Sequence, residues 1–326
     1  METFKTLSIQ KQASLYARLP EARLTNHMDK AKANWIVFGE QLLAEHFERI
    51  HTFTGYHNDI VDVWKVGPYQ VALMQGDLMS EHEIILQTLS LDYASLNDVP
   101  DLSKPGLIVL DMDSTAIQIE CIDEIAKLVG VGEQVSELTE RAMQGELDFE
   151  QSLRSRVAAL AGADESILTQ VRDELALMPD LGGLIGTLRQ FGWKTAIASG
   201  GFTYFSDHLK TTVNLDYARS NQLEIANGKL TGNVLGEIVS AQTKADILHE
   251  LAELYDIETH NTVAVGDGAN DLIMMEAAGL GIAYHAKSKV EKSAQAAVRY
   301  AGLGGVLCIL SASLAKQRKI SFQAKP

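Results

Sequence analysis

Two aspartates follow an apolar run near residue 110 and are the first candidates for chemistry. Residues 107–110 read Leu-Ile-Val-Leu, which predicts a buried strand, and Asp111 and Asp113 stand where that strand should end. Because side chains on an extended segment repeat every second residue, both carboxylates point to the same side. Asp111 can attack a phosphorus atom and ligate a hard cation, while Asp113 can handle the proton of the leaving group. This spacing favours phosphoryl transfer.

The same Asp-x-Asp spacing also occurs in calcium-binding loops and in capped turns. An EF-hand loop that begins at Asp111 would need a glycine near its middle and a glutamate at its last position. Ala116 and Ile122 occupy these positions, so an EF-hand is excluded. The capped turn stays an alternative when these two aspartates are considered alone.

Two later segments supply groups that suit a phosphate. Ser199-Gly200-Gly201 follows the apolar run 195–198 and precedes a predicted helix, so a hydroxyl and glycine amides can meet a phosphate at a positively polarised helix start. Lys244 lies in the first turn of another predicted helix, where the macrodipole disfavours a lysine, and it is a candidate clamp on a phosphoryl oxygen. The alternatives are a strand-to-helix turn that needs glycine for its geometry and a solvated surface lysine.

A last acidic segment, Gly266-Asp267-Gly268-Ala269-Asn270-Asp271, follows the apolar run 262–265. Asp267 between two glycines suits magnesium, which favours carboxylate oxygen and retained water. An Asx turn that caps the next helix is the alternative, and Asn270 and Asp271 can serve as such caps. Because four separate segments agree on one chemistry, we favour phosphoryl transfer.

The elements that must position these residues alternate from residue 182 onward. Strands are predicted at 194–198, 262–265 and 281–284, with helices ending at 190, starting at 202, spanning 243–255 and starting at 270, and a hairpin at Asn227-Gly228. This alternation predicts an α/β fold with a doubly wound parallel sheet, whose ligands bind beyond the carboxyl ends of the strands. The candidate residues fall at such ends.

An inserted helical bundle is predicted between the first two strands of this sheet. Its four helices are predicted at 122–129, 133–144, 149–160 and 165–177, separated by glycines. The bundle would form a cap of residues 123–181 on a core of residues 105–122 and 182–315. In the third helix an apolar stripe runs from Phe149 to Leu160, and Arg156 borders it.

The first hundred residues form a separate small α/β unit. Residues 93–106 have the composition of a connector, so we divide the chain into a first domain of residues 1–100 and a second domain of residues 101–326 that carries the four segments. Strands are predicted at 35–38 and 70–74, and helices at 41–50 and 80–89. The unit is either a ligand-sensing regulatory domain or a dimerisation surface that makes a homodimer, and no residue in it decides between them.

Composition restricts the class of protein and of partner. The 326 residues carry 28 basic and 43 acidic side chains, a net charge of -15, which argues against nucleic acid or an anionic membrane as a partner. The N-terminus lacks the features of a secretory signal and no stretch reaches membrane-spanning length, which predicts a cytoplasmic protein. Two cysteines exclude a disulfide framework, and Cys121 is better explained as a buried apolar residue than as a nucleophile.

Together, the four segments resemble the haloacid dehalogenase superfamily of aspartate-nucleophile phosphatases. Glu120 within residues 117–124, together with the runs 145–157 and 198–202, resembles the phosphoserine phosphatase family within it. The resemblance covers about residues 105–310. It implies a haloacid dehalogenase-like core with a helical cap, and hydrolysis of O-phospho-L-serine to L-serine and phosphate, the last step of serine biosynthesis.

The resemblance also implies a role for each motif residue. Asp111 is the nucleophile that forms an aspartyl-phosphate, and Asp113 protonates the serine oxygen and then activates water. Mg²⁺ is held by the Asp111 carboxylate, the Asp113 backbone carbonyl and Asp267, and Asp271 supports the metal and the lysine. The residues that grip the phosphoryl group are Ser199, Gly200, Lys244 and Asn270.

Substrate choice is implied to rest on residues at the edge of the cap. Glu120 reads the amino group and Arg156 the carboxylate of phosphoserine, and an Arg–carboxylate pair can be bidentate. Phe149 and Met143 form part of an apolar wall, although packing inside the bundle explains both almost as well. Closure of the cap would exclude water and bring Arg156 to the substrate.

Two other functions are compatible with these residues. A phosphotransferase would pass the aspartyl-bound phosphoryl group to another hydroxy amino acid and would leave every motif unchanged. A non-catalytic sensor would bind phosphoserine through the same pocket, although the intact Asp111 and Asp113 argue against it.

Overall fold

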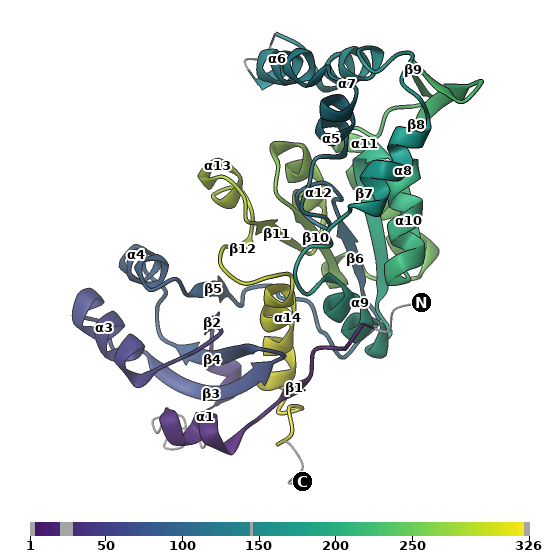
Figure 1. The fold of residues 1–326 in the computed structure, drawn as a ribbon. Coiled ribbons are helices and arrows are strands. Elements are labelled where there is room, and N and C mark those ends of the chain that lie inside the picture. Colours follow the sequence, from purple (N-terminus) through teal and green to yellow (C-terminus); the bar gives the residue numbers. More distant parts are fainter. Residues whose placement is uncertain (1–3, 20–28, 144–145, 323–326) are drawn as a thin grey trace.

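The computed structural model describes residues 4–19, 29–143 and 146–322, and these residues form two sheets (Figure 1). The first sheet is antiparallel, with the strand order β1-β3-β4-β2-β5. Its strands are β1 (Ile9–Gln10), β2 (Trp35–Gly39), β3 (Asp59–Val66), β4 (Tyr69–Gln75) and β5 (Asp92–Ser95). The helices beside it are α1 (Ala13–Arg18), the short 3₁₀ turn η1 (Lys30–Lys32), α3 (Ala44–Thr54) and α4 (Ser80–Thr88).

The local sequence accounts for most of this first sheet. The predicted strands at 35–38 and 70–74 are confirmed as β2 and β4, and the predicted helix at 80–89 is confirmed as α4. A tight turn joins β3 to β4, with Gly67 at φ 54°, a conformation that favours glycine. The helix predicted at 41–50 begins three residues later, at Ala44, and continues to Thr54.

The second sheet has the strand order β12-β11-β10-β6-β7-β8-β9. Neighbouring strands in it are parallel except in the β8–β9 hairpin, which is antiparallel. This confirms the predicted doubly wound parallel sheet. Its strands are β6 (Leu107–Leu110), β7 (Lys194–Phe202), β8 (Tyr217–Ala226), β9 (Lys229–Leu235), β10 (Thr262–Gly266), β11 (Leu280–Tyr284) and β12 (Ala296–Val298). Because β6 lies between β10 and β7, its carboxyl end lies between theirs.

Helices cover both faces of this sheet, and β6 contributes to both cores. Ile108 and Leu110 join one apolar cluster, and Leu107 and Val109 join another, as expected for alternating side chains on a strand buried on two sides. The helices and 3₁₀ turns are α9 (Leu181–Gln190), α10 (Thr203–Val213), α11 (Ala241–Leu254), η2 (Thr259–Asn261), η3 (Ala269–Asp271), α12 (Leu272–Ala277), α13 (Ser288–Glu291) and α14 (Gly304–Lys316).

The helical insertion stands above the carboxyl edge of the sheet (Figure 1). It consists of α5 (Cys121–Leu128), α6 (Gly132–Met143), α7 (Phe149–Ala158) and α8 (Ser166–Asp173). The two segments that connect it to the sheet pair with each other: the Met178 amide donates to the Ala116 carbonyl at 2.9 Å, and Ile117 bridges to Leu177. The prediction that the fourth helix reaches residue 177 is wrong, because residues 174–178 form this return connection.

The last helix, α14, joins the two sheets. It contacts β2, β3 and β4 of the first sheet as well as α9, and Trp64 Nε1 donates to Ser311 Oγ at 2.9 Å. The Asp92 carboxylate accepts backbone N–H groups from residues 299–301 at 2.7 to 3.1 Å. A helix that is apolar on all sides must be buried on all sides, which explains its central place. Among the described residues, no helix is long and apolar enough to cross a membrane.

Candidate active site

Asp111 stands at the carboxyl end of β6, at the centre of the second sheet. Its amide donates to the Val265 carbonyl at 2.9 Å, which continues the ladder with β10 for one more residue. Its side chain is buried, and Oδ1 accepts the Met112 amide at 2.7 Å. The carboxylate is therefore held in one orientation at the edge where parallel-sheet ligands bind.

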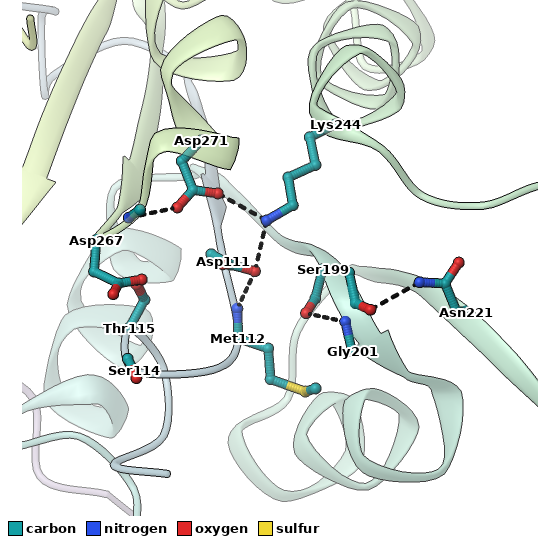
Figure 2. A network of polar contacts seen from close by, with 12 residues as sticks. Asp111, Met112, Ser114, Thr115, Ser199, Gly201, Asn221, Lys244, Asp267 and Asp271 are labelled. Carbon is teal, nitrogen blue, oxygen red and sulfur yellow. Dashed lines mark hydrogen bonds and ion pairs between the residues drawn. The ribbon is translucent and has the colours of Figure 1, made fainter. Parts of the chain in front are cut away.

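Lys244 lies between two carboxylates. Its Nζ is 2.9 Å from Asp111 Oδ1 and 2.7 Å from Asp271 Oδ1 (Figure 2). Burial alone would lower the pKa of Lys244, but attraction to Asp111 and Asp271 outweighs burial and raises that pKa. The residue is 0% exposed, so the alternative of a solvated surface lysine is wrong.

Three carboxylates gather at this edge. Oxygen atoms of Asp111, Asp267 and Asp271 lie within 4.8 Å of one another. Burial, followed by repulsion from Asp271 and Asp111, raises the pKa of Asp267 to about 7. Burial and Asp111 likewise raise the pKa of Asp271 to about 6, although Lys244 opposes this shift. The group is short of positive charge and offers only oxygen donors, so it fits a hard divalent cation.

The acidic loop after β10 contains the capped turn that was one of the two interpretations considered for it. Asp271 Oδ2 accepts the Gly268 amide at 3.0 Å, so this residue closes the turn while its Oδ1 accepts from Lys244. A Cβ on Gly266 would lie 2.4 Å from the Asp271 carboxyl carbon, so the close approach requires glycine. Thr115 Oγ1 donates to Asp267 Oδ1 at 3.4 Å, and Asn270 lies against Gly268.

Asp113 is the second carboxylate of the first motif. Burial, followed by repulsion from Glu120 and Asp111, raises the pKa of Asp113 well above its usual range. A carboxyl group that keeps its proton can donate it to a leaving group. The Cys121 amide donates to Asp113 Oδ1 at 3.4 Å. Burial raises the pKa of the Cys121 thiol, which disfavours a thiolate nucleophile at this position.

The Ser199-Gly200-Gly201 segment approaches the other side of Asp113. Ser199 is buried, and its Oγ accepts the Gly201 amide at 2.9 Å, so the hydroxyl proton is left to donate elsewhere. A Cβ on Gly201 would lie 2.9 Å from Asp113 Oδ2, and one on Gly200 would lie 2.8 Å from Phe149 Cζ. The two glycines therefore allow the backbone to approach the acid and the cap closely.

Glu120 and Arg156 lie toward the cap. Ser114 Oγ donates to Glu120 Oε1 at 2.7 Å, and burial followed by Asp111 raises the pKa of Glu120. Among the described residues, the buried Nε of Arg156 has no hydrogen-bond partner. Burial lowers the pKa of Arg156, and attraction to Asp123, Glu120 and Asp113 opposes this shift without cancelling it. Met143 ends α6, and its side chain lies outside the described part of the chain.

The structure adds residues that sequence reasoning missed. Asn221 Nδ2 on β8 donates to the Gly200 carbonyl (Figure 2). Ser114 Oγ donates to Glu120, and Thr115 Oγ1 donates to Asp267. Ser114 also has φ 55°, an uncommon value for serine. An asparagine inside a strand is a weak signal in the sequence, because strands are depleted in this residue.

Comparison with known proteins agrees with this geometry. The model of the haloacid dehalogenase-like hydrolase family matches residues 105–279, and a domain of unknown function (DUF5609) matches residues 31–95. A protein of Vibrio cholerae named phosphoserine phosphatase is 67% identical over 326 residues, which is 100% of this chain and 99% of the relative.

Solved structures point to the same family. A crystal structure of a probable phosphoserine phosphatase from Vibrio cholerae, in an unliganded form, has a TM-score of 0.92 and 66% identity and covers 99% of this chain and 100% of its own. A phospho-aspartyl intermediate analogue of a phosphoserine phosphatase has a TM-score of 0.59 and 39% identity, covering 63% of this chain and 98% of its own. The chain therefore belongs to the haloacid dehalogenase-like hydrolases and, within them, to the phosphoserine phosphatase family.

Proposed function

We propose that the protein is a Mg²⁺-dependent phosphoserine phosphatase that hydrolyses O-phospho-L-serine to L-serine and phosphate, the last step of serine biosynthesis. The observation that carries the proposal is the buried Asp111 carboxylate, held 2.9 Å from Lys244 and grouped with Asp267 and Asp271. The relatives named phosphoserine phosphatase, one of them matching over the full chain, support the choice of substrate.

The reaction has two displacements at phosphorus. In the first, an Asp111 oxygen forms a bond to phosphorus, the bond from phosphorus to the serine oxygen breaks, and that oxygen takes the proton of Asp113. In the second, water attacks phosphorus and gives its proton to Asp113 as the Asp111–phosphorus bond breaks. The raised pKa of Asp113 supports this role, because the acid must hold a proton at the start of the first step.

The surroundings must offset the repulsion between an anionic nucleophile and an anionic phosphoryl group. Lys244 supplies one positive charge directly beside Asp111. Mg²⁺ would be held by the Asp111 and Asp267 carboxylates and the Asp113 backbone carbonyl, with Asp271 supporting them, and would supply further positive charge at the site. The groups that would grip the phosphoryl oxygens are Ser199, the Gly200 amide, Lys244 and Asn270.

The serine part of the substrate would lie toward the cap. Glu120 would bind the ammonium group, and Arg156, whose buried Nε has no partner among the described residues, would bind the carboxylate. Phe149, against Gly200, would form one apolar wall. The assignment of Met143 to this wall, the homodimer and the cytoplasmic location stay predictions.

Phosphate release from L-phosphoserine tests the proposal. Wild type should release phosphate, and Asp111→Asn should not, because an amide cannot accept the phosphoryl group. Asp101→Asn is the matched control, since Asp101 bonds to Ser103 in the connector, and it should keep wild-type activity. Comparable rates for wild type and Asp111→Asn would refute the nucleophile.

Three further measurements separate the alternatives. A chelator should abolish phosphate release, added Mg²⁺ should restore it, and Asp267→Asn should raise the Mg²⁺ concentration needed for half-maximal rate. Appearance of a phosphorylated acceptor in place of free phosphate would favour a phosphotransferase. A wild-type protein that bound phosphoserine but released no phosphate with Mg²⁺ would favour a sensor.

A further inference from the structure

The ladder between β7 and β8 is interrupted beside the candidate site. Ala198 pairs with Arg219 and Phe202 pairs with Asn221, so residues 199–201 of β7 lie opposite Ser220 alone. Such a bulge removes backbone groups from the regular ladder, and buried backbone groups need other partners. The bulged residues are the Ser199-Gly200-Gly201 segment.

The side chain of Asn221 fills this interruption. Its Nδ2 donates to the Gly200 carbonyl at 2.8 Å, and its Oδ1 accepts the Val239 amide at 2.8 Å (Figure 2 draws the first bond). The residue is 1% exposed. Because the amide both donates and accepts, and both groups are used, it is held in a single orientation.

Val239 leads directly to the helix that carries Lys244. The next residue, Ser240, is the N-cap of α11: its Oγ accepts the Thr243 amide at 3.2 Å, and its carbonyl accepts the Lys244 amide at 3.0 Å. One buried side chain therefore links the loop of Ser199 and Gly200 to the start of the Lys244 helix.

We infer that Asn221 is a positioning residue for phosphoryl binding, and this inference rests on the proposed function. Asn221 acts through Gly200 and Lys244, which approach the phosphoryl group from different elements. Donors that hold a transferring group lose much of their effect when displaced by a fraction of an ångström. Loss of the link should lower the affinity for inorganic phosphate, and raise KM for phosphoserine, by about tenfold each.

Two substitutions of Asn221 distinguish the loss of its hydrogen bonds from the effect of an added negative charge. Asn221→Leu keeps the approximate shape and removes both hydrogen bonds without adding charge. Asn221→Asp keeps the acceptor for Val239 but loses the donor to Gly200. Asn261→Leu is the matched control, since Asn261 is 2% exposed, accepts the Asp101 amide at 2.7 Å and donates to the Pro105 carbonyl at 2.8 Å, away from the site.

Two measurements report phosphate affinity in the presence of Mg²⁺: the dissociation constant of inorganic phosphate by calorimetry, and its inhibition constant as a competitive inhibitor of phosphoserine hydrolysis. KM and kcat for phosphoserine and the melting temperature are measured for the same variants. Both Asn221 variants should bind phosphate about tenfold more weakly, whereas Asn261→Leu should lower the melting temperature and leave phosphate affinity unchanged. If Asn221→Leu does not fold, Asn221→Ser takes its place under the same criterion.

The inference fails if Asn221→Leu, or Asn221→Ser in its place, binds phosphate as tightly as Asn261→Leu. It also fails if only Asn221→Asp loses affinity, because charge alone would then explain the loss. Failure of the proposed function would be distinguishable, since it appears as a wild-type protein that releases no phosphate from phosphoserine.

Discussion

The hydroxyl of Tyr69 donates to the Asp180 carboxylate at 2.6 Å and joins the first sheet to the residue that precedes α9, just after the return connection from the helical insertion. The same hydroxyl accepts the Gly302 amide at 2.9 Å. Asp180 itself has φ 67°, and a Cβ on Gly304 would lie 2.6 Å from the Tyr69 ring. The first sheet, the base of the cap and the segment before α14 therefore meet at one side chain.

Removing this hydroxyl should weaken the junction. Tyr69→Phe loses both hydrogen bonds and leaves the Asp180 carboxylate without this donor, so we expect a loss of about 1–3 kcal/mol in the free energy of unfolding by urea. Tyr93→Phe is the control: its hydroxyl accepts from Gln87 Nε2 at 3.2 Å, and Gln87 lies within the first unit, so the loss should be smaller. Equal losses would contradict the special role of the junction.

Lys244 is expected to serve both stability and activity. Lys244→Met leaves Asp111 and Asp271 buried without their cation, which should cost about 3–5 kcal/mol of unfolding free energy at neutral pH. The rate of phosphate release should fall at least about 100-fold. Lys194→Met is the control, because Lys194 is partly exposed and its Nζ lies 3.0 Å from Asp216 Oδ1. It should change the free energy of unfolding by about 1 kcal/mol or less and leave the rate of phosphate release unchanged. A Lys244→Met protein with the unfolding free energy and the rate of phosphate release of wild type would refute both expectations.

Ser114 should act on substrate choice through Glu120. Ser114→Ala removes the hydrogen bond that holds Glu120 Oε1, so KM for phosphoserine should rise about tenfold. KM for 3-phosphooxypropionate, the same ester without the amino group, should change little, because Glu120 has no ammonium to bind there. Ser103→Ala removes a similar serine–carboxylate bond, to Asp101, and should affect neither substrate. A parallel rise for both substrates would argue against this role of Ser114.

Asp216 should make stability depend on pH. Burial raises the pKa of Asp216, but hydrogen bonds from Lys194 and Thr195 outweigh burial and hold that pKa below its usual value. A depressed folded-state pKa adds stability above the unfolded pKa of about 4, and that stability is lost as pH falls through the folded value. Asp216→Asn should therefore lower the free energy of unfolding by about 1–2 kcal/mol at pH 7. The difference in unfolding free energy between this variant and wild type should shrink below pH ~4. Urea unfolding across this range measures it, and a constant difference would contradict the assignment.

The sequence by itself determined which edge of the sheet the candidate residues share and which chemical groups gather there. Asp111, Ser199 and Asp267 each follow an apolar strand, and the carboxyl ends of parallel strands meet at one edge, so local pattern was sufficient to bring them together. The inserted helices were also visible in the spacing of apolar residues. The predicted end of α8 is wrong because residues 174–178 pair with the outgoing connection at residues 116–118, which a local pattern does not reveal.

Only the tertiary structure decided which polar groups are buried and what they contact. The sequence left Lys244 open to interpretation as a surface residue, and its burial results from Asp111 and Asp271 on two other segments. Asn221 carries no motif, and its role depends on a bulge in β7 and on Val239 beyond the β8–β9 hairpin. The packing of α14 on the first sheet likewise joins opposite ends of the chain. Periodicity reports the face that a residue occupies within its own element, whereas burial and hydrogen bonding depend on neighbours distant in sequence.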